Sequence, residues 1–298
     1  MAVYVNTNVS SLNGRRYLNN VQNQLNTTYQ RLSSGMRINS AKDDAAGLQI
    51  ADRLTTQING LNQGNRNTND GIALAQTIEG ALDETSSMLQ KIRTLAVQSA
   101  NGTNTADDRK AIDTEAKALQ DEITRIAKQT KFGGKTVLVG ATAGSIYNTT
   151  SNPKGTVGQL IFQVGANKGD EISFDVANFT FDGIHSQAGK NTAAFNNSNL
   201  ILSTASGAKA VISLMDSMIA KVDAQRSGLG AIQNRLESSI RNQSNVSANQ
   251  ADARSRIRDA DFAEESANLS QQSIIQQAAT SMLMQANSRP QLALSMLG

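Results

Sequence analysis

The sequence lacks several residue types on which enzymes commonly depend. Its 298 residues include no cysteine and no tryptophan, one histidine, two prolines and only 4% aromatic residues. Without cysteine, disulfides, thiolate metal sites and cysteine nucleophiles are excluded. A single histidine removes nearly all catalytic triads, zinc sites and histidine acid–base mechanisms. The composition therefore argues against an enzyme, and it predicts neither a cofactor nor a metal site.

Charge and hydropathy argue against two classes of partner. Lys and Arg number 28, Asp and Glu number 25, and the basic residues are scattered without interleaved aromatics. We therefore expect no nucleic-acid binding. Because no run of about 18 apolar residues is present, we expect no membrane insertion. Residues 1–8 lack the basic and apolar segments of a cleaved secretory signal, which predicts a cytoplasmic protein or export by a route that does not read one.

Apolar residues recur every three or four positions over most of the chain, which predicts long amphipathic helices. The runs cover 51–75, 74–95, 112–126 and, longest of all, 208–246. The stretch 101–105 (Asn-Gly-Thr-Asn-Thr) interrupts them and predicts a helical hairpin. The expected fold class is mainly α, a long antiparallel helical bundle or coiled coil.

Two of the expected helix starts have capping signals. Ser40 precedes Asp43 by three residues, and Thr105 precedes Asp108 by the same spacing. A hydroxyl followed at this distance by a carboxylate can satisfy backbone N–H groups in both directions, as in a capping box. We therefore expect each pair to begin a helix.

The middle of the chain differs from its flanks. Residues 133–205 contain ten of the 22 glycines, and 162–195 contain five of the seven phenylalanines. Strand-like runs at 160–164 and 171–176, separated by 165–170, predict a small β-hairpin. Phe179 and Phe181 continue the alternation, and the Ser/Asn/Ala-rich stretch 186–205 is expected to be an exposed loop.

Two segments imitate ligand-binding loops. The stretch 132–136 (Phe-Gly-Gly-Lys-Thr) resembles the end of a phosphate-binding loop, but Gln129 occupies the position of the required first glycine. The stretch 65–71 resembles a calcium loop, but Asp70 stands where glycine is needed. We therefore expect a turn in the first case and a continuous helix in the second.

Both ends of the chain are amphipathic. Their candidate packing residues are Val5, Val9, Leu12, Leu18, Val21, Leu25, Leu32, Ile274, Ile275, Met282 and Leu283. The intervening Asn, Ser, Thr and Gln are weak or middling helix formers, so an isolated helix here would be marginal in water. We expect these ends to gain order when further copies of the chain supply partners.

Four motifs resemble bacterial flagellin. They are 31–54 (beginning Arg-Leu-Ser-Ser-Gly), 95–101 (Leu-Ala-Val-Gln-Ser-Ala-Asn), 253–262 (Ala-Arg-Ser-Arg-Ile-Arg-Asp-Ala-Asp-Phe) and 276–287 (beginning Gln-Gln-Ala-Ala-Thr). The resemblance covers about 1–140 and 205–298. It implies a self-assembling subunit of the flagellar filament, with both termini paired, secreted to the cell exterior without a cleaved signal peptide.

The same resemblance implies an internal organisation. Residues 1–43 and 256–298 would be paired terminal helices in the filament's inner core. Residues 44–139 and 206–255 would form a long-helix bundle, and 140–205 a short, β-rich, exposed and much reduced outer region. Implied partners are further copies of the chain, an export chaperone on the C-terminal segment, and the filament cap and hook-junction proteins.

Recognition by a vertebrate innate immune receptor is also implied for the family. The matching positions are Gln90, Lys91, Leu95 and Glu115, and Lys91 departs from the arginine common in recognised members. The compact ammonium of lysine there replaces the planar guanidinium of arginine, so weaker recognition is expected. Two alternatives stay open at this stage, namely a hook–filament junction protein and, in a different class, a signalling coiled coil.

Overall fold

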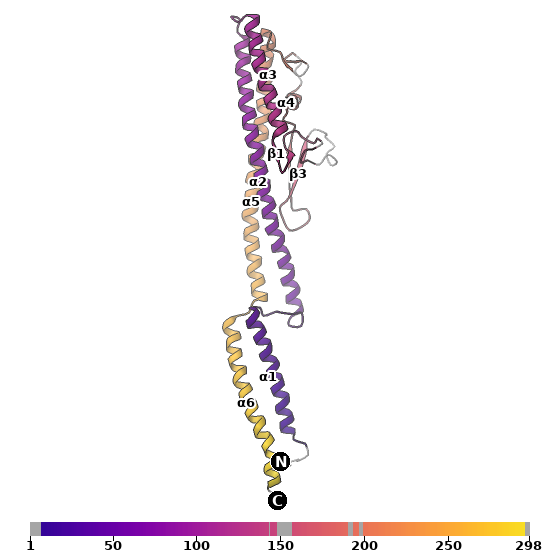
Figure 1. Cartoon of the computed structure of the whole chain (residues 1–298), viewed down its shortest axis with the longest axis vertical. Coiled ribbons are helices and arrows are strands. Elements are labelled where there is room, and N and C mark those ends of the chain that lie inside the picture. Colours follow the sequence, from indigo (N-terminus) through magenta and orange to yellow (C-terminus); the bar gives the residue numbers. More distant parts are fainter. Residues whose placement is uncertain (1–6, 143, 148–156, 190–192, 197–198, 296–298) are drawn as a thin grey trace. The chain divides into compact units, whose positions relative to one another are not determined.

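The computed structural model describes residues 7–142, 144–147, 157–189, 193–196 and 199–295, with side chains as far as residue 288. Helices predominate (Figure 1). They are α1 (Val9–Ser34), α2 (Ala45–Ala100), α3 (Ala106–Gln129), α4 (Phe181–Gln187), α5 (Ala205–Arg258) and α6 (Phe262–Ser295). The described strands are β1 (Lys131–Phe132), β2 (Lys135–Thr136), β3 (Gly158–Gln163), β4 (Glu171–Val176), β5 (Phe195–Asn196) and β6 (Asn199–Leu200).

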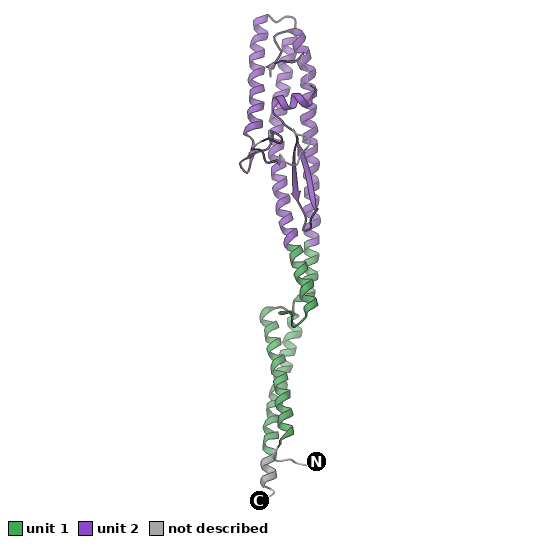
Figure 2. Ribbon diagram, turned by 90° about the vertical axis from the view of Figure 1, so that its right-hand side faces the viewer, with its two compact units in different colours: residues 1–58, 247–298 green, residues 59–246 purple. Residues whose placement is uncertain are grey.

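The chain divides into two compact units, which are coloured separately in Figure 2. One comprises residues 1–58 and 247–298, and we call it the terminal unit. The other comprises residues 59–246, and we call it the bundle unit. The two apolar runs found at 51–75 and 74–95 belong to one continuous helix, α2, of 56 residues.

In the bundle unit, α2, α3 and α5 lie around one apolar core (Figures 1 and 2). Helices α2 and α5 are antiparallel, because Arg93 pairs with Asp216 at 2.6 Å while Glu79 accepts a hydrogen bond from Gln233 at 2.9 Å. Fully buried side chains of the three helices include Ile78, Leu82, Leu89, Ile92, Ile123 and Met215. The predicted mainly α, antiparallel bundle is confirmed.

The helical hairpin between α2 and α3 forms as predicted, and Thr105 begins α3. The Thr105 hydroxyl accepts a hydrogen bond from the Asp108 N–H, while the Asp108 carboxylate accepts from the Thr105 hydroxyl at 2.7 Å and from its N–H at 2.9 Å. The pKa of Asp108 is lowered mainly by the hydrogen bond from the Thr105 hydroxyl and, after it, by the hydrogen bond from the Thr105 N–H. The stabilisation is therefore complete above the carboxyl's unfolded-state pKa and is lost as pH falls through the lowered folded-state value.

Replacing Thr105 by alanine should lower the free energy of unfolding of the bundle unit by about 1 kcal/mol, because the first turn of α3 loses its cap. Urea unfolding followed by circular dichroism measures the change. Thr103→Ala is the matched control, since this exposed threonine of the same turn has no hydrogen bond among the described residues. Equal effects of the two substitutions would contradict the assignment of the cap.

The other expected capping box does not begin a helix. The Asp43 carboxylate accepts hydrogen bonds from the backbone N–H groups of Asn39 and Ser40, at 3.1 and 2.9 Å, and so closes a turn ahead of α2. Asp44 accepts from the Gly47 N–H at 2.8 Å, as an N-cap residue does. The spacing of Ser40 and Asp43 does indicate a local hydrogen-bonding motif, but the motif is a turn and not the start of a helix.

The predicted β-hairpin is confirmed. Strands β3 and β4 pair antiparallel, from Gly158 opposite Val176 to Gln163 opposite Glu171. Along β4 every second residue is buried, so one face of the hairpin lies against the core and the other faces solvent. The alternation of apolar and polar residues in the sequence is sufficient to predict this strand, because successive side chains of a strand point to opposite faces.

Two expectations for the rest of the insert are wrong. Phe181 does not extend the strand pattern but begins α4, where the Thr180 hydroxyl accepts a hydrogen bond from the Gly183 N–H at 3.2 Å. The stretch 186–205 is not wholly exposed, since Leu200 and Leu202 are buried in the bundle core. Residues 190–192 and 197–198 of that stretch lie outside the described residues. The polar composition of the segment concealed these two anchoring leucines.

The two segments that imitate ligand-binding loops form part of a continuous helix and a turn. Residues 65–71 continue α2, and the buried Thr68 hydroxyl donates to the Gly64 carbonyl at 2.7 Å. Gly133 and Gly134 form the turn between β1 and β2 with φ of 57° and 81°. Successive positive φ values favour glycine in a tight hairpin turn, and this explains the glycine pair.

Candidate functional site

Exposed apolar side chains are concentrated on α1 and α6. Among the described residues eleven large apolar side chains are exposed, and these two helices carry eight of them. The eight are Val9, Leu12, Tyr17, Tyr29, Phe262, Ile274, Met282 and Met284. Exposed apolar side chains concentrated on two neighbouring helices, rather than scattered over the molecule, indicate a surface that another molecule covers. We call these eight residues the terminal apolar surface, and they are the candidate functional site.

Helices α1 and α6 lie side by side in the terminal unit (Figures 1 and 2). Val21 and Leu25 of α1 and Ala279 of α6 are buried between them. The helices approach closely at Gly14, where an added Cβ would lie 3.1 Å from Cδ1 of Leu283. A pair of helices can cover only part of each, and the eight residues of the terminal apolar surface stay in contact with water.

Three side-chain hydrogen bonds determine how the two helices align. The Asn8 amide donates to the Ala286 carbonyl at 2.7 Å, the Thr28 hydroxyl to the Gln272 amide oxygen at 3.2 Å, and the Arg31 guanidinium to the Glu265 carboxylate at 3.1 Å. The alignment is antiparallel. A shift of either helix by one turn would separate all three pairs, so they specify one register.

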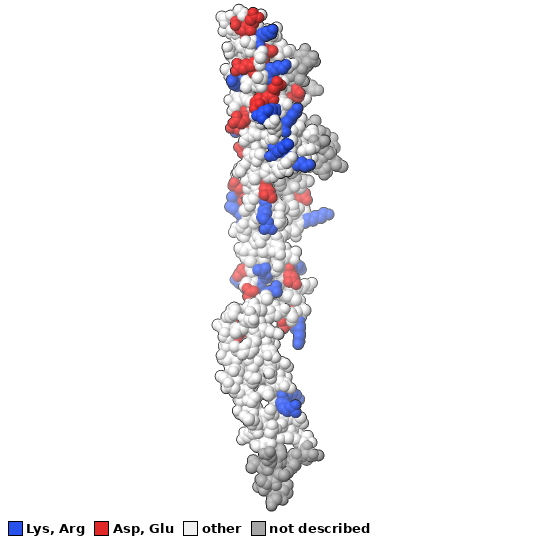
Figure 3. Space-filling model, in the orientation of Figure 1, with Lys and Arg blue, Asp and Glu red and all other residues white. Residues whose placement is uncertain are grey.

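The terminal helices carry very little charge. Residues 266–288 contain no Lys, Arg, Asp or Glu, and residues 1–42 contain no acidic residue. The surface of α1 and α6 is accordingly almost uncharged in Figure 3, whereas charges of both signs are dense over α3. Glu265, whose side chain is 9% exposed, is neutralised by Arg31. Few charges would therefore need to be desolvated if this surface were covered.

The predicted packing residues fall into three groups. Val21 and Leu25 are buried within the helix pair, and Leu18, Leu32, Ile275 and Leu283 are half-buried. The exposed ones are Val9, Leu12, Ile274 and Met282. Val5 lies outside the described residues. The periodicity found a single stripe on each helix, whereas the structure separates contacts within the chain from surface left uncovered.

Four members of the terminal apolar surface were not identified from the sequence. They are Tyr17, Tyr29, Phe262 and Met284. The predicted stripes do not include these four positions, and Phe262 lies outside the segments that the stripes cover. The usable signal is composition, because these large apolar residues lie in or beside segments with very few charged side chains.

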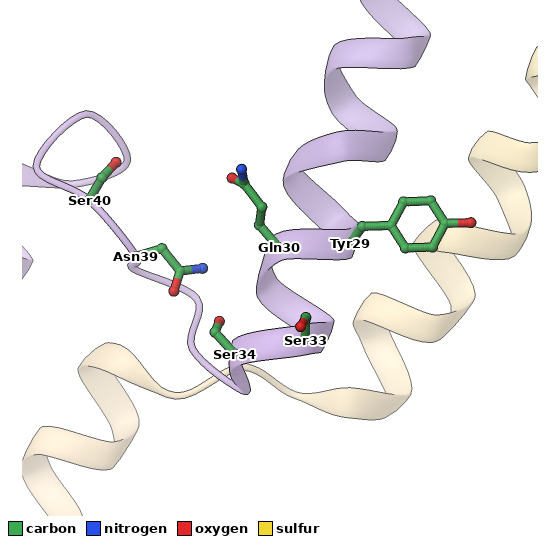
Figure 4. A pocket seen from close by; sticks show the side chains of 6 residues that line it. All are labelled: Tyr29, Gln30, Ser33, Ser34, Asn39 and Ser40. Carbon is green, nitrogen blue, oxygen red and sulfur yellow. The ribbon is translucent and has the colours of Figure 1, made fainter.

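A hollow beside the C-terminal end of α1 is lined by polar side chains. It is lined by Tyr29, Gln30, Ser33 and Ser34 of α1 together with Asn39 and Ser40 (Figure 4). Amides and hydroxyls of this kind can bind water or a polar group, but they include no general base. The described residues contain no cluster of three or more potential metal ligands. Nor, over the same part of the chain, is any helix both long and apolar enough to cross a membrane.

The positions expected to contact an immune receptor lie on α2 and α3. Gln90, Lys91 and Glu115 are exposed, and the Lys91 ammonium lies 3.3 Å from the Glu115 carboxylate. Leu95 is only 7% exposed and belongs to the bundle core. The structure thus brings Lys91 and Glu115 together at the surface, leaves Gln90 exposed and places the leucine beneath the surface.

Comparisons with known proteins give one consistent result. Residues 5–143 match the bacterial flagellin N-terminal helical region, and residues 212–297 match the bacterial flagellin C-terminal helical region. The chain is 37% identical to polar flagellin C of Vibrio parahaemolyticus and 37% identical to flagellin A of Vibrio cholerae, with all of each chain covered. The first alignment spans 383 positions against 298 residues here, so that relative contains insertions that this chain lacks.

A solved structure shows the same fold. A protein described as flagellar hook-associated from Vibrio parahaemolyticus matches with a TM-score of 0.56 and 19% identity, covering 73% of this chain and all of that one. The identity along the whole chain is to flagellins, which favours a filament subunit over a hook–filament junction protein or a signalling coiled coil. This chain therefore belongs to the bacterial flagellin family, as a structural subunit that polymerises into the extracellular flagellar filament.

Proposed function

We propose that the terminal apolar surface forms the contacts between subunits in the filament core. The concentration of eight of the eleven exposed large apolar side chains on α1 and α6 carries this proposal. In this arrangement 1–43 and 256–298 line the inner core, 44–139 and 206–255 form the surrounding bundle, and 140–205 is the reduced outer region. Val9, Leu12, Ile274 and Met282 contact neighbouring subunits, while Val21 and Leu25 hold α1 to α6.

The energetics of this surface favour polymerisation. Burial of apolar surface contributes about 25 cal/mol per Å², and the same contact is repeated at every neighbour. The stretch 266–288 has no charged side chain to desolvate, so little opposes that gain. When contacts between different patches of successive copies do not close into a ring, they give an open helical filament.

Folding of the terminal helices is coupled to assembly in this proposal. A two-helix pair buries a small core, here Val21, Leu25 and Ala279, and short of further partners such a pair is marginal. Neighbouring subunits supply the remaining apolar contacts and so stabilise the helical form of both ends. The same surface would be covered by an export chaperone on 256–298 before assembly, and by the filament cap and hook-junction proteins at the ends of the polymer.

Leu12→Asp should raise the concentration of subunit needed for polymerisation by at least about tenfold, which corresponds to roughly 1.4 kcal/mol per subunit. The carboxylate would lose the apolar contact and would have to be desolvated. Ile161→Asp is the matched control, because Leu12 and Ile161 are both 55% exposed and Ile161 lies on β3 in the bundle unit. Sedimentation of filaments at graded subunit concentrations gives the threshold for each variant. Equal thresholds for the two would overturn the proposal.

Two finer features belong to the same proposal. One is export of the subunit by a route that does not read a cleaved signal peptide, as the family resemblance implies. An innate immune receptor would contact the exposed face that carries Gln90, Lys91 and Glu115, with the buried Leu95 maintaining its shape. The Lys91–Glu115 ion pair would have to open for either group to bind the receptor directly.

A further inference from the structure

The chain contains three Asn–Gly pairs in different backbone environments. Asn13–Gly14 lies in α1 and Asn59–Gly60 lies in α2. Asn101–Gly102 lies in the turn between α2 and α3, outside any helix. All three asparagines are exposed, so exposure does not distinguish them. Backbone geometry does, and it determines whether the asparagine side chain can react with the following peptide nitrogen.

The turn at Asn101–Gly102 leaves both reacting groups unengaged. The backbone N–H of Asn101 donates to the Gln98 carbonyl at 3.2 Å and its carbonyl accepts from the Asn104 N–H at 3.4 Å. Within the described residues, neither the Asn101 side-chain amide nor the Gly102 N–H has a hydrogen-bond partner. An added Cβ on Gly102 would meet nothing within 4 Å, so no side chain obstructs the approach.

The helical pair at Asn59–Gly60 is held differently. Inside α2 the Gly60 N–H is engaged in the i to i−4 hydrogen-bond ladder. Gly60 also packs tightly, since an added Cβ would lie 2.7 Å from the Ala166 side chain. To attack the Asn59 side chain, this nitrogen would first have to leave the helix by local unfolding, which costs free energy.

We propose that Asn101 is a site of spontaneous deamidation in the mature filament. The Gly102 nitrogen loses its proton and attacks Cγ of Asn101, the new N–Cγ bond forms, and the Cγ–Nδ2 bond breaks as ammonia leaves. Water then opens the resulting succinimide at either carbonyl, which gives aspartate or isoaspartate. The net reaction consumes one water, releases ammonia and leaves a carboxylate, and no oxidant, reductant or enzyme is needed.

The product changes the electrostatics of one end of the bundle unit. The Arg109 guanidinium already donates to the Asn101 carbonyl at 3.1 Å and to the Ser99 carbonyl at 3.0 Å, so the new carboxylate forms beside a cation. The isoaspartate product also lengthens the backbone of a turn that joins two long helices. An extracellular polymer is not resynthesised in place, so the modification accumulates with the age of each subunit.

Incubation of the full-length chain at mildly alkaline pH, followed by tryptic digestion and mass spectrometry, tests the proposal. Amide-to-acid conversion should be roughly tenfold or more faster in peptide 94–109, which contains Asn101, than in peptide 54–66, which contains Asn59, because Gly60 must first be released by local opening. In urea-unfolded chain the two rates should become similar. The comparison uses Asn59 rather than Asn13, because the order of α1 depends on assembly in the proposed function.

Gly102→Ala provides a second measurement. Gly102 has open space around it and no positive φ, so alanine should leave the fold unchanged while it hinders attack by the peptide nitrogen. Slower conversion of Asn101 in this variant, with unaltered circular dichroism, supports the proposal. Equal conversion of Asn59 and Asn101 in the folded chain would overturn it, as would conversion of Asn101 in the unfolded chain only. Neither outcome bears on the terminal apolar surface.

Discussion

Replacing Gly64 by alanine should destabilise the bundle unit by about 3 kcal/mol. Gly64 lies in α2, where alanine would ordinarily be preferred by about 1 kcal/mol, so the expected sign is reversed. The reason is a backbone contact. An added Cβ would lie 2.0 Å from the Val164 carbonyl oxygen and 2.8 Å from its carbon, a distance no real structure maintains.

The hairpin of β3 and β4 cannot move away from Gly64 without losing hydrogen bonds to α2 and α5. The Val164 carbonyl accepts a hydrogen bond from the Gln243 amide of α5, and the Asn67 amide of α2 donates to the Gln163 carbonyl at 3.0 Å. Moving the backbone away from Gly64 would stretch both bonds and leave buried polar groups without partners. The steric clash and the lost hydrogen bonds therefore both destabilise the Gly64→Ala variant.

Gly80→Ala is the control for this experiment. Gly80 lies in the same helix, and an added Cβ would meet nothing within 4 Å. This substitution should stabilise the bundle unit by up to about 1 kcal/mol, because alanine loses less backbone entropy in a helix. Urea unfolding of both variants measures the difference. If Gly64→Ala were as stable as Gly80→Ala, the hairpin would not be docked on α2 as described.

Deleting residues 257–298 should abolish filament formation while the bundle unit stays folded. The deletion removes α6 and with it half of the terminal apolar surface, so α1 loses its partner and neighbouring copies lose their contacts. The bundle core is unaffected, because its buried residues run from Leu74 to Leu236. Deleting residues 1–39, which removes α1, should have the same effect. Electron microscopy of concentrated protein and thermal unfolding of the dilute protein measure the two parts of this prediction.

The full-length chain under identical conditions is the control for both deletions. Normal filaments from either truncated chain would show that the terminal helices are dispensable for polymerisation. A truncated chain that neither polymerises nor unfolds cooperatively would show instead that the bundle unit depends on them. Only loss of filaments with a preserved cooperative transition agrees with two units that have separate cores.

Much of the fold could be predicted from local patterns. The periodicity of 208–246 predicts a helix because apolar residues three and four apart share one helix face, and α5 covers that range. Thr105 with Asp108 was sufficient to place the start of α3, since a cap involves only neighbouring residues. The hairpin of β3 and β4 followed from alternation and a glycine-containing turn.

The remaining features depend on contacts between residues far apart in the sequence. Nothing near Gly64 in the chain indicates that the Val164 carbonyl approaches it, and nothing near Leu202 indicates that a polar stretch anchors in the core. Likewise, Val21 and Leu12 belong to the same predicted stripe, although one is buried against α6 and the other is exposed.

The sequence by itself determined the helical character of this protein and its family resemblance, because each is encoded in residue order over short distances. Only the tertiary structure decided which apolar residues the chain covers itself and which it leaves for others. The physical reason is that two packed helices bury one face of each. Which face that is depends on the register set by pairs such as Arg31 and Glu265, 234 residues apart.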